Sequence, residues 1–340
     1  HGDVEVLRWK DGSGEWQSWT LDQVAEITAR LTSALADLGV GHGDRVVLML
    51  RNRQEFHPLD LAVLFRGATP VSIYNSSAPE QIEYLVNDCG AKVAIVENAD
   101  FLDRFLKVRG DLPTLEHIAI LEPSEGIGDD IIRYDDMVAF EPADLVAEAS
   151  TATLDDLATI IYTSGTTGRP KGCMLTHRNL CANVAQVVDA IGGEIVPDDR
   201  GLLFLPLAHS LTKGTLLFCL EMGVPLGFTS DIAHLPEELA VVRPSVIAAV
   251  PRIFEKVHNS AHHRAHSTRK GPIFDRAESV AVRWSKEHHA GTVHPWTAAE
   301  HWVFERLVYG KLRQALGGEM RLAFSGGGPL GERLTHFFDG

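Results

Sequence analysis

The sequence has few cysteines and no pattern that would join them. It contains four in 340 residues, Cys89, Cys173, Cys181 and Cys219, and none of them forms a C-x-x-C pair. This wide spacing excludes a compact disulfide framework and the usual zinc-binding patterns. Unpaired cysteines are typical of proteins in reducing compartments, so the sequence predicts a cytoplasmic protein.

Long apolar runs and an excess of basic residues are also lacking. The most apolar stretch, 201–228, is interrupted by His209, Lys213 and Glu221, and it falls short of the roughly 18–20 apolar residues of a membrane span. The polar start of the chain, HGDVEVLRWK, is unlike a signal peptide. A formal net charge of −15 argues against nonspecific binding of nucleic acid, which needs a basic face. We therefore expect no transmembrane segment and no nucleic-acid partner, while peripheral membrane contact and oligomeric state stay open.

Two common catalytic motifs are missing as well. The phosphate-binding pattern G-x-x-x-x-G-K-[ST] does not occur, because Gly310-Lys311 is followed by Leu312. The nucleophile elbow G-x-S-x-G is not found either. The first of these absences removes the basis for a kinase-like or GTPase site.

Short apolar segments alternate with helical ones along most of the chain. The pattern predicts strands at 45–50, 69–73, 92–97, 118–121, 157–162, 202–205, 246–250 and 322–324. Thr20 and Gln23 form a predicted capping box for the first helix, which Gly39 ends. Such alternation is typical of layered α/β subdomains with largely parallel sheets. The segment 122–156 is richer in Asp, Glu, Pro and Gly, and predicts a boundary between a first subdomain, 1–150, and a second, 151–340.

The segment 162–172, YTSGTTGRPKG, carries the strongest chemical signal. An apolar strand, LATIIY, leads directly into four hydroxyl side chains, three glycines and one lysine. Glycines allow the backbone to approach a ligand, successive N–H groups form an anion-binding nest, and lysine adds a compact positive charge. Glycine- and threonine-rich loops are often only polar connections, but the lysine, the preceding strand and the order of residues favour a triphosphate-binding loop.

The same segment resembles the signature loop of the adenylate-forming family, which includes acyl- and aryl-CoA synthetases, luciferases and the adenylation domains of peptide synthetases. LPLAH at 205–209 resembles the next motif of that family, and FSGGGPL at 324–330 resembles its adenine-binding turn. VPRIFEKV at 250–257 and FTSD at 228–231 are similar to the long-chain fatty acyl-CoA synthetase branch. The resemblance covers essentially the whole chain.

The resemblance implies a role for each segment. The loop would hold the β- and γ-phosphates of ATP through Thr163, Ser164, Gly165, Thr166, Thr167, Gly168 and Lys171. Thr166 would also help to place Mg²⁺, and His209 would lie near the acyl carboxylate and the α-phosphate. The turn against adenine would consist of Ser325, Gly326, Gly327, Gly328 and Pro329. Taken alone, His209 is typical of a core histidine, and the turn is typical of a simple strand-to-helix connection. In combination with the loop at 162–172, both features favour a functional role. Lys171 and His209 are the expected catalytic residues.

The implied activity is that of a long-chain fatty acid–CoA ligase that uses ATP, Mg²⁺ and CoA. Two alternatives share the loop: a fatty acyl-AMP ligase or adenylation domain that loads a carrier protein, and a noncatalytic nucleotide-binding domain. The family's acidic magnesium-binding residue, its ribose-binding aspartate and its mobile C-terminal domain should follow Gly340. We therefore expect the 340 residues to be an N-terminal fragment with little or no activity of its own. Acyl chain length is not predicted.

Three histidines remain outside this interpretation. His258, His262 and His266 recur at four-residue spacing on a predicted helix, a geometry suitable for a metal ion. The polar neighbours and the absence of H-E-x-x-H favour a solvated helix face instead.

Overall fold

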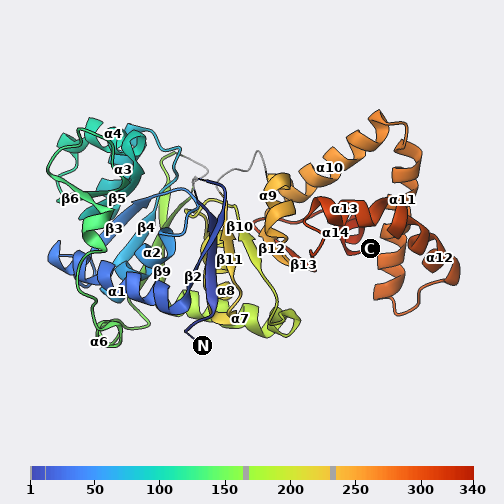
Figure 1. Cartoon of the computed structure of the whole chain (residues 1–340), viewed down its shortest axis with the longest axis horizontal. Helices are drawn as coiled ribbons and strands as arrows, with labels where there is room; N and C mark the ends of the chain where they lie inside the picture. Colours follow the sequence, from blue (N-terminus) through green and yellow to red (C-terminus); the bar gives the residue numbers. More distant parts are fainter. Residues whose placement is uncertain (1, 12, 164–167, 230–234) are drawn as a thin grey trace. The chain divides into compact units, whose positions relative to one another are not determined.

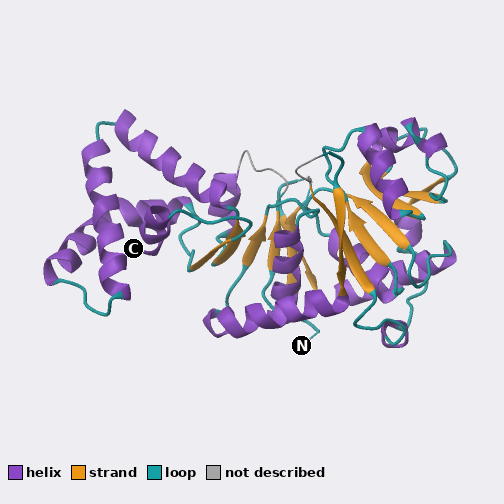
Figure 2. Ribbon diagram, turned by 180° about the vertical axis from the view of Figure 1, so that it is seen from behind, coloured by secondary structure: helices purple, strands orange, loops and turns teal. Residues whose placement is uncertain are grey.

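The structure is a computed structural model that describes residues 2–11, 13–163, 168–229 and 235–340. The chain forms two compact units, which Figures 1 and 2 show. Unit 1 consists of His1–Asp198 and Leu203–Ser230, and unit 2 of Asp199–Leu202 and Asp231–Gly340. The division expected from the sequence, 1–150 and 151–340, is a different one and stays a prediction.

Unit 1 is built around a five-stranded sheet in which every neighbouring pair is parallel, in the order β4-β3-β5-β6-β7. Its strands are β3 (Arg45–Met49), β4 (Thr69–Ser72), β5 (Val93–Asn98), β6 (His117–Glu122) and β7 (Ile131–Arg133). The helices before and between them are α1 (Leu21–Asp37), α2 (Phe56–Phe65), α3 (Pro79–Cys89) and α4 (Ala99–Lys107).

Both faces of this sheet are buried, because its strands are continuous apolar runs. In β3, Val46 and Leu48 belong to a core cluster that includes residues of α1 and α2. Val47 and Met49 alternate with them and belong to a second cluster, with residues of α3 and α4. Successive side chains of a strand point to opposite faces, so one apolar run supplies both layers.

The first helix begins as the sequence predicts. The Thr20 hydroxyl accepts a hydrogen bond from the Gln23 N–H at 3.3 Å, and the Thr20 N–H donates to Gln23 Oε1 at 2.8 Å. This reciprocal pair satisfies two backbone groups that the first turn leaves unpaired. Gly39, with φ of +69°, follows the end of the helix. The predicted capping box is therefore confirmed.

Unit 1 also contains two smaller sets of strands. β1 (Glu5–Lys10) pairs antiparallel with β2 (Trp16–Thr20) and parallel with β11 (Leu226–Phe228). β8 (Leu157–Thr163) and β9 (Lys171–Thr176) form an antiparallel hairpin. The remaining helices are α5 (Tyr134–Met137), α6 (Leu145–Ala149), α7 (His177–Ile191) and α8 (Ser210–Met222), with short 3₁₀ turns at Arg109–Asp111 and Gly192–Glu194.

Unit 2 is mostly helical around a short parallel sheet. β12 (Val246–Ala249) pairs with β13 (Leu322–Ser325) and, through Val246 opposite Gly201, with β10 (Gly201–Leu203). The helices are α9 (Leu235–Val242), α10 (Pro251–Ser267), α11 (Gly271–His289), α12 (Pro295–Phe304), α13 (Gly310–Ala315) and α14 (Glu332–Asp339), with a π-helical turn at Glu305–Tyr309. Phe274, Tyr309 and Phe337 form a small core together with the alanines of α11.

The predicted fold class, layered α/β with largely parallel sheets, is confirmed. Each predicted strand is present, with ends that differ by at most about two residues, which is the usual uncertainty of such boundaries. The sequence analysis missed β1, β2, β7, β9 and β11. Among the helices in the described part of the chain, none is long and apolar enough to cross a membrane.

Candidate functional site

The predicted phosphate loop connects the two strands of the β8–β9 hairpin. Thr163, the last residue of β8, lies opposite Lys171, the first residue of β9, and both are exposed. Gly168 is also exposed and has a φ of +126°. The other expected ligands, Ser164, Gly165, Thr166 and Thr167, lie outside the described residues. The structure therefore places the two ends of the loop side by side, at the end of the hairpin that the loop closes.

Helix α3 supports both ends of this loop. The Tyr162 hydroxyl donates to Asp88 Oδ2 at 2.6 Å, and the Tyr84 hydroxyl donates to the Pro170 carbonyl at 2.8 Å. The Arg169 guanidinium lies 5.2 Å from the centre of the Tyr84 ring, within the range of a cation–π contact. Burial, with Asp88 close by, raises the pKa of Tyr162 well above its usual range, so its hydroxyl stays a donor.

Gly172 permits the close pairing of the two strands. It lies opposite Tyr162, and a Cβ added to it would come within 2.8 Å of Ile160 Cγ2 and 3.3 Å of the Tyr162 ring. Because the buried Ile160 and Tyr162 side chains belong to the core beneath the hairpin, they have little room to move. Gly172 thus allows β9 to pack closely against the Ile160 and Tyr162 side chains of β8.

The Lys171 side chain is exposed and, within the described part of the chain, its ammonium group has no ion-pair or hydrogen-bond partner. Arg178 in the first turn of α7, by contrast, pairs with Asp155 at 2.9 Å. A compact charge at the base of a glycine-rich loop is suited to contact an anionic ligand.

His209 is the N-terminal cap of α8. Its Nδ1 accepts a hydrogen bond from the Leu211 N–H at 3.2 Å, and its own carbonyl accepts from the Lys213 N–H at 3.1 Å. An Nδ1 that accepts leaves the proton of the neutral ring on Nε2. The half-buried ring therefore presents a donor, at a helix N-terminus where anions are favoured.

A buried ion pair fixes the turn of α8 that follows His209. Lys213 Nζ lies 2.5 Å from each carboxylate oxygen of Asp60, and the two side chains are only 5% and 1% exposed. Asp60 belongs to α2, so the pair joins α8 to the helix that covers the central sheet. Sequence reasoning missed this pair; the available signal was Asp60 as the only acidic residue of α2 and Lys213 as the only basic residue of α8.

His57 lies one turn before Asp60 and is fully buried, with no hydrogen-bond partner for Nδ1 among the described residues. Desolvation by burial, assisted by the nearby Lys213 charge and opposed by Asp60, lowers the pKa of His57 to about 4. The apolar cavity that His57 lines, between Leu7, Leu216 and Val224, has a volume of about 10 Å³. That is room for at most about one water molecule, so this cavity does not accommodate an acyl chain.

The second predicted segment, 325–329, lies in unit 2. β13 ends at Ser325, and the Gly326 N–H donates to the Ala249 carbonyl of β12 at 3.0 Å. Gly327 has a φ of +76°, a conformation that favours glycine. Ser325, Gly327, Gly328 and Pro329 are exposed, and helix α14 begins only at Glu332. The turn thus presents its backbone at the carboxyl end of two parallel strands, where α/β sheets bind ligands.

The predicted site residues that the structure describes fall into two groups, one in each unit. Thr163, Gly168, Lys171 and His209 belong to unit 1, and Ser325–Pro329 belongs to unit 2. Sequence reasoning did not find Tyr84, Asp88, Asp60 or Lys213, which support the first group.

Comparison with known proteins assigns the chain to a family. The sequence profile described as "AMP-binding enzyme" matches residues 1–340. The chain belongs to this family. The resemblance to adenylate-forming enzymes inferred from the loop is therefore confirmed.

The relatives of this chain include long-chain acyl-CoA ligases. It is 40% identical over 327 residues to the long-chain-fatty-acid–CoA ligase FadD15 of Mycobacterium bovis, covering 96% of this chain and 54% of the relative. It is 27% identical over 347 residues to the human long-chain-fatty-acid–CoA ligase 1, covering 97% of this chain and 48% of the relative. The chain thus spans about half the length of the curated relatives that it matches.

Solved structures share the fold. The anthranilate CoA ligase AuaEII in complex with anthranoyl-AMP is 25% identical, with a TM-score of 0.66 over 76% of this chain and 48% of that one. The adenylation domain of a carboxylic acid reductase from Segniliparus rugosus covers 99% of this chain and 56% of that one, with a TM-score of 0.73 and 20% identity. The second likeness shows the fold alone.

Proposed function

We propose that the complete protein to which this chain belongs activates a long-chain fatty acid with ATP and transfers the acyl group to CoA. The observation that carries the proposal is the 40% identity to a long-chain-fatty-acid–CoA ligase over 96% of the chain. The hairpin, with Thr163 opposite Lys171 at the two ends of a glycine-rich loop, supports it.

In the first half-reaction, a fatty carboxylate oxygen attacks the α-phosphorus of ATP, and pyrophosphate leaves. The carboxylate and ATP are both anions and repel each other. Cations and hydrogen-bond donors that hold them in line lower the activation barrier. We assign the β- and γ-phosphates to the loop 163–168 and the Lys171 ammonium. The His209 Nε2–H would donate to the carboxylate or to an α-phosphate oxygen, and the turn 325–329 would lie against adenine.

In the second half-reaction, the CoA thiolate attacks the acyl carbonyl, a carbon–sulfur bond forms, and AMP leaves. No covalent acyl-enzyme is required, in agreement with the absence of a nucleophile elbow in the sequence. Mg²⁺ would shield the charge of the phosphates, and we assign Thr166 to it. Because Thr166 lies outside the described residues, this assignment rests on the resemblance alone.

We also propose that the reaction takes place in the cytoplasm. All four cysteines are free, and Cys173 and Cys181 are exposed, which suits a reducing compartment.

The proposal can be tested by product analysis on the full-length protein with ATP, palmitate and CoA. We expect palmitoyl-CoA, AMP and pyrophosphate in equal amounts. If palmitoyl-AMP accumulates and CoA is not acylated, the protein is a carrier-loading ligase. If ATP binds but no pyrophosphate is released with any acid from acetate to long-chain acids, the noncatalytic alternative holds.

The role of Lys171 can be tested in the same protein. Lys171→Ala should leave fatty acid binding intact and lower pyrophosphate release strongly, because the positive charge that stabilises the leaving pyrophosphate is lost. Arg178→Ala, which removes a nearby exposed cation that is already paired with Asp155, serves as the control and should keep its activity.

A further inference from the structure

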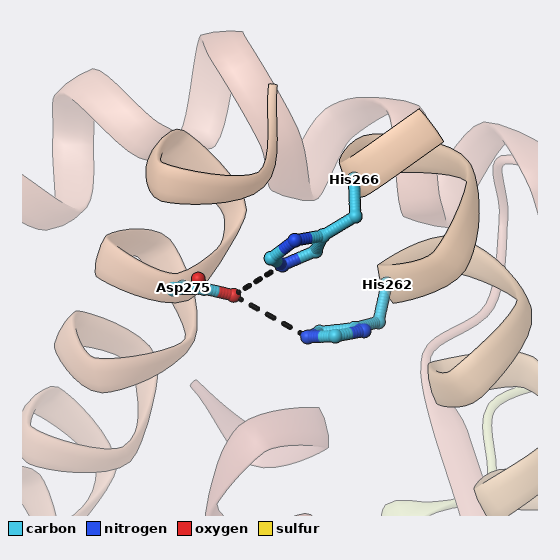
Figure 3. A group of neighbouring side chains, drawn as sticks. All are labelled: His262, His266 and Asp275. Atoms are coloured by element: carbon cyan, nitrogen blue, oxygen red, sulfur yellow. Dashed lines mark hydrogen bonds and ion pairs between the residues drawn. The ribbon is translucent and has the colours of Figure 1, made fainter. Parts of the chain in front are cut away.

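Helices α10 and α11 of unit 2 bring two histidines and an aspartate together, as Figure 3 shows. His262 and His266 are one turn apart on α10, and Asp275 faces them from the second turn of α11. His266 Nε2 lies 3.0 Å from Asp275 Oδ1, and His262 Nε2 lies 3.4 Å from the same oxygen. One ligand atom from each of the three side chains lies within 4.8 Å of the others.

These distances fit the coordination sphere of a small divalent ion. Zn²⁺ binds histidine nitrogen at about 2.0–2.1 Å and carboxylate oxygen at about 2.0–2.2 Å in a tetrahedron, so its ligand atoms lie about 3.3–3.4 Å apart. The two measured edges, 3.0 and 3.4 Å, bracket that value. Two imidazoles and one carboxylate are a ligand set typical of zinc, and three protein ligands leave a fourth position for water.

The packing around the cluster restricts the orientation of the rings. A Cβ added to Gly271 would come within 2.5 Å of His266 Nδ1, so the first residue of α11 lies directly against this ring. The Phe274 ring contacts the His262 ring edge-on, at 5.7 Å between ring centres and 85° between planes. The centres of the His262 and His266 rings lie 4.2 Å apart. Fixed rings lose little entropy on binding a metal ion, which favours a site.

The third histidine of the series corrects the sequence interpretation of a fully solvated helix face. His258 is buried, only 3% exposed, and its Nε2 lies 3.3 Å from the Glu278 carboxylate rather than from Asp275. Desolvation by burial lowers the pKa of His258. His258 therefore belongs to the packing between α10 and α11, and the exposed end of the series, His262 and His266, carries the ligands.

We propose that His262, His266 and Asp275 bind one Zn²⁺ ion, which joins the C-terminal part of α10 to the start of α11. The ion would replace the protons that the two imidazoles share with Asp275, with both Nε2 atoms as ligands and the protons on Nδ1. Because the ligands come from both sides of the turn Thr268–Lys270, the ion would hold the two helices together at the surface of unit 2. This site is independent of the proposed ligase reaction.

The experiment is calorimetric titration of the full-length, untagged protein, freed of metal with EDTA and dialysed, with zinc chloride. Cys173→Ser and Cys181→Ser are introduced first, because exposed thiols also bind zinc. We expect about one Zn²⁺ per chain. His266→Gln and Asp275→Asn should each weaken zinc binding by at least about 10–100-fold. Loss of a residue that only orients a ligand has an effect of this size, and loss of the ligand itself should have no smaller one. The control His263→Gln, next to the cluster on the same helix, should bind as the parent does.

Two results would overturn the proposal. One is the lack of stoichiometric zinc binding by the parent protein, and the other is binding in His266→Gln and Asp275→Asn within about twofold of the parent. Should these variants fail to fold, Co²⁺ added to the parent protein decides. Visible bands of a four- or five-coordinate nitrogen and oxygen site support the proposal, and the spectrum of aqueous Co²⁺ contradicts it.

Discussion

At the scale of single residues, the Asp60–Lys213 pair is the most consequential feature of unit 1. Both side chains are almost without access to water, and the pair joins α2 to the helix that His209 caps. A buried ion pair adds little to stability compared with apolar residues of the same volume, but loss of one partner leaves an uncompensated charge. Its main effect is therefore on the position of α8.

Removal of one charge should destabilise the protein strongly. Asp60→Asn should lower the free energy of unfolding by about 3–5 kcal/mol, because Lys213 is then buried without a counter-ion. The double variant Asp60→Leu/Lys213→Met should lose less free energy of unfolding than Asp60→Asn, because it leaves no buried charge. Urea unfolding followed by circular dichroism measures both, and equal losses in the two variants would contradict the account.

The matched control is an ion pair on the surface. Lys107 and Asp103 lie 2.6 Å apart on α4 and are 60% and 59% exposed. Lys107→Met should change the free energy of unfolding by less than about 1 kcal/mol, since solvent screens exposed pairs.

His57 predicts a pH dependence of stability. Its pKa is about 4 in the folded chain and 6.5 in its ordinary state, so only the unfolded chain takes up this proton between about pH 6.5 and 4. Stability therefore falls as the pH falls through this window, with about 2 kcal/mol lost by about pH 5. His57→Gln should lack this part of the loss, while Asp60 and Lys213 beside it stay in place. Identical pH profiles for parent and variant, obtained from urea unfolding, would refute the assignment.

At the scale of elements, the β8–β9 hairpin determines the geometry of the phosphate loop. Tyr84 and Asp88 of α3 hold the strand ends through hydrogen bonds of 2.8 and 2.6 Å. The loop is thus supported by a helix packed on the central sheet, which is the kind of rigid support that a binding site requires.

Loss of the Tyr84 hydroxyl should affect ATP binding more than folding. In the full-length protein, Tyr84→Phe should raise the KM for ATP severalfold, because the Pro170 carbonyl loses its anchor, while the free energy of unfolding falls by only about 0.5–1.5 kcal/mol. Steady-state kinetics measure the first effect and urea unfolding the second. An unchanged KM would show that α3 does not position the loop. Tyr74→Phe, which removes a hydroxyl from an exposed side chain, serves as the control.

Gly172 tests the packing of the hairpin itself. Gly172→Ala places a methyl group 2.8 Å from Ile160 Cγ2 and should lower the free energy of unfolding by about 1–3 kcal/mol. Gly193→Ala, where a Cβ meets no atom of the described residues within 4 Å, is the matched substitution and should be close to neutral. Equal thermal stability of the two variants would contradict this account, because it would mean that β8 and β9 move apart to accommodate the methyl group without loss of stability.

The elements that could be predicted from the sequence share one property. β3, β5 and β6 are buried on both faces, so each is a continuous apolar run between polar turns, and such runs are easily recognised. β9 could not be predicted, because its residues KGCMLT are largely exposed and only the pairing with β8 makes them a strand.

The candidate site was predictable only in part. Thr163, Lys171, His209 and 325–329 follow from motifs that are contiguous in the sequence. Their supports do not: the Tyr84–Pro170 bond spans 86 residues and the Asp60–Lys213 pair spans 153. Contacts of this kind depend on how α2, α3 and α8 pack, which no local pattern encodes. His258 was misjudged for the same reason, since the rings that pack against it, Phe274 of α11 and Phe337 of α14, lie far from it in the sequence.

At the scale of the whole molecule, the charge of the protein opposes its proposed ligands. A formal net charge of −15 repels ATP, a fatty carboxylate and CoA alike. Binding therefore depends on a few local positive groups, and Lys171 is the one that the structure places at the end of the loop. The assignment of Lys171 to the phosphates is therefore the central claim about the site.

The most direct measurement is fatty acid-dependent exchange of labelled pyrophosphate into ATP, without CoA, by the full-length protein and its Lys171→Ala variant. It isolates the formation of acyl-AMP from the thiol transfer that follows. Our account predicts exchange that requires a long-chain fatty acid and falls by about 10²–10³-fold in the variant, the effect of losing one electrostatic contact in a transition state. Exchange without fatty acid, or a variant within about twofold of the parent, would contradict it.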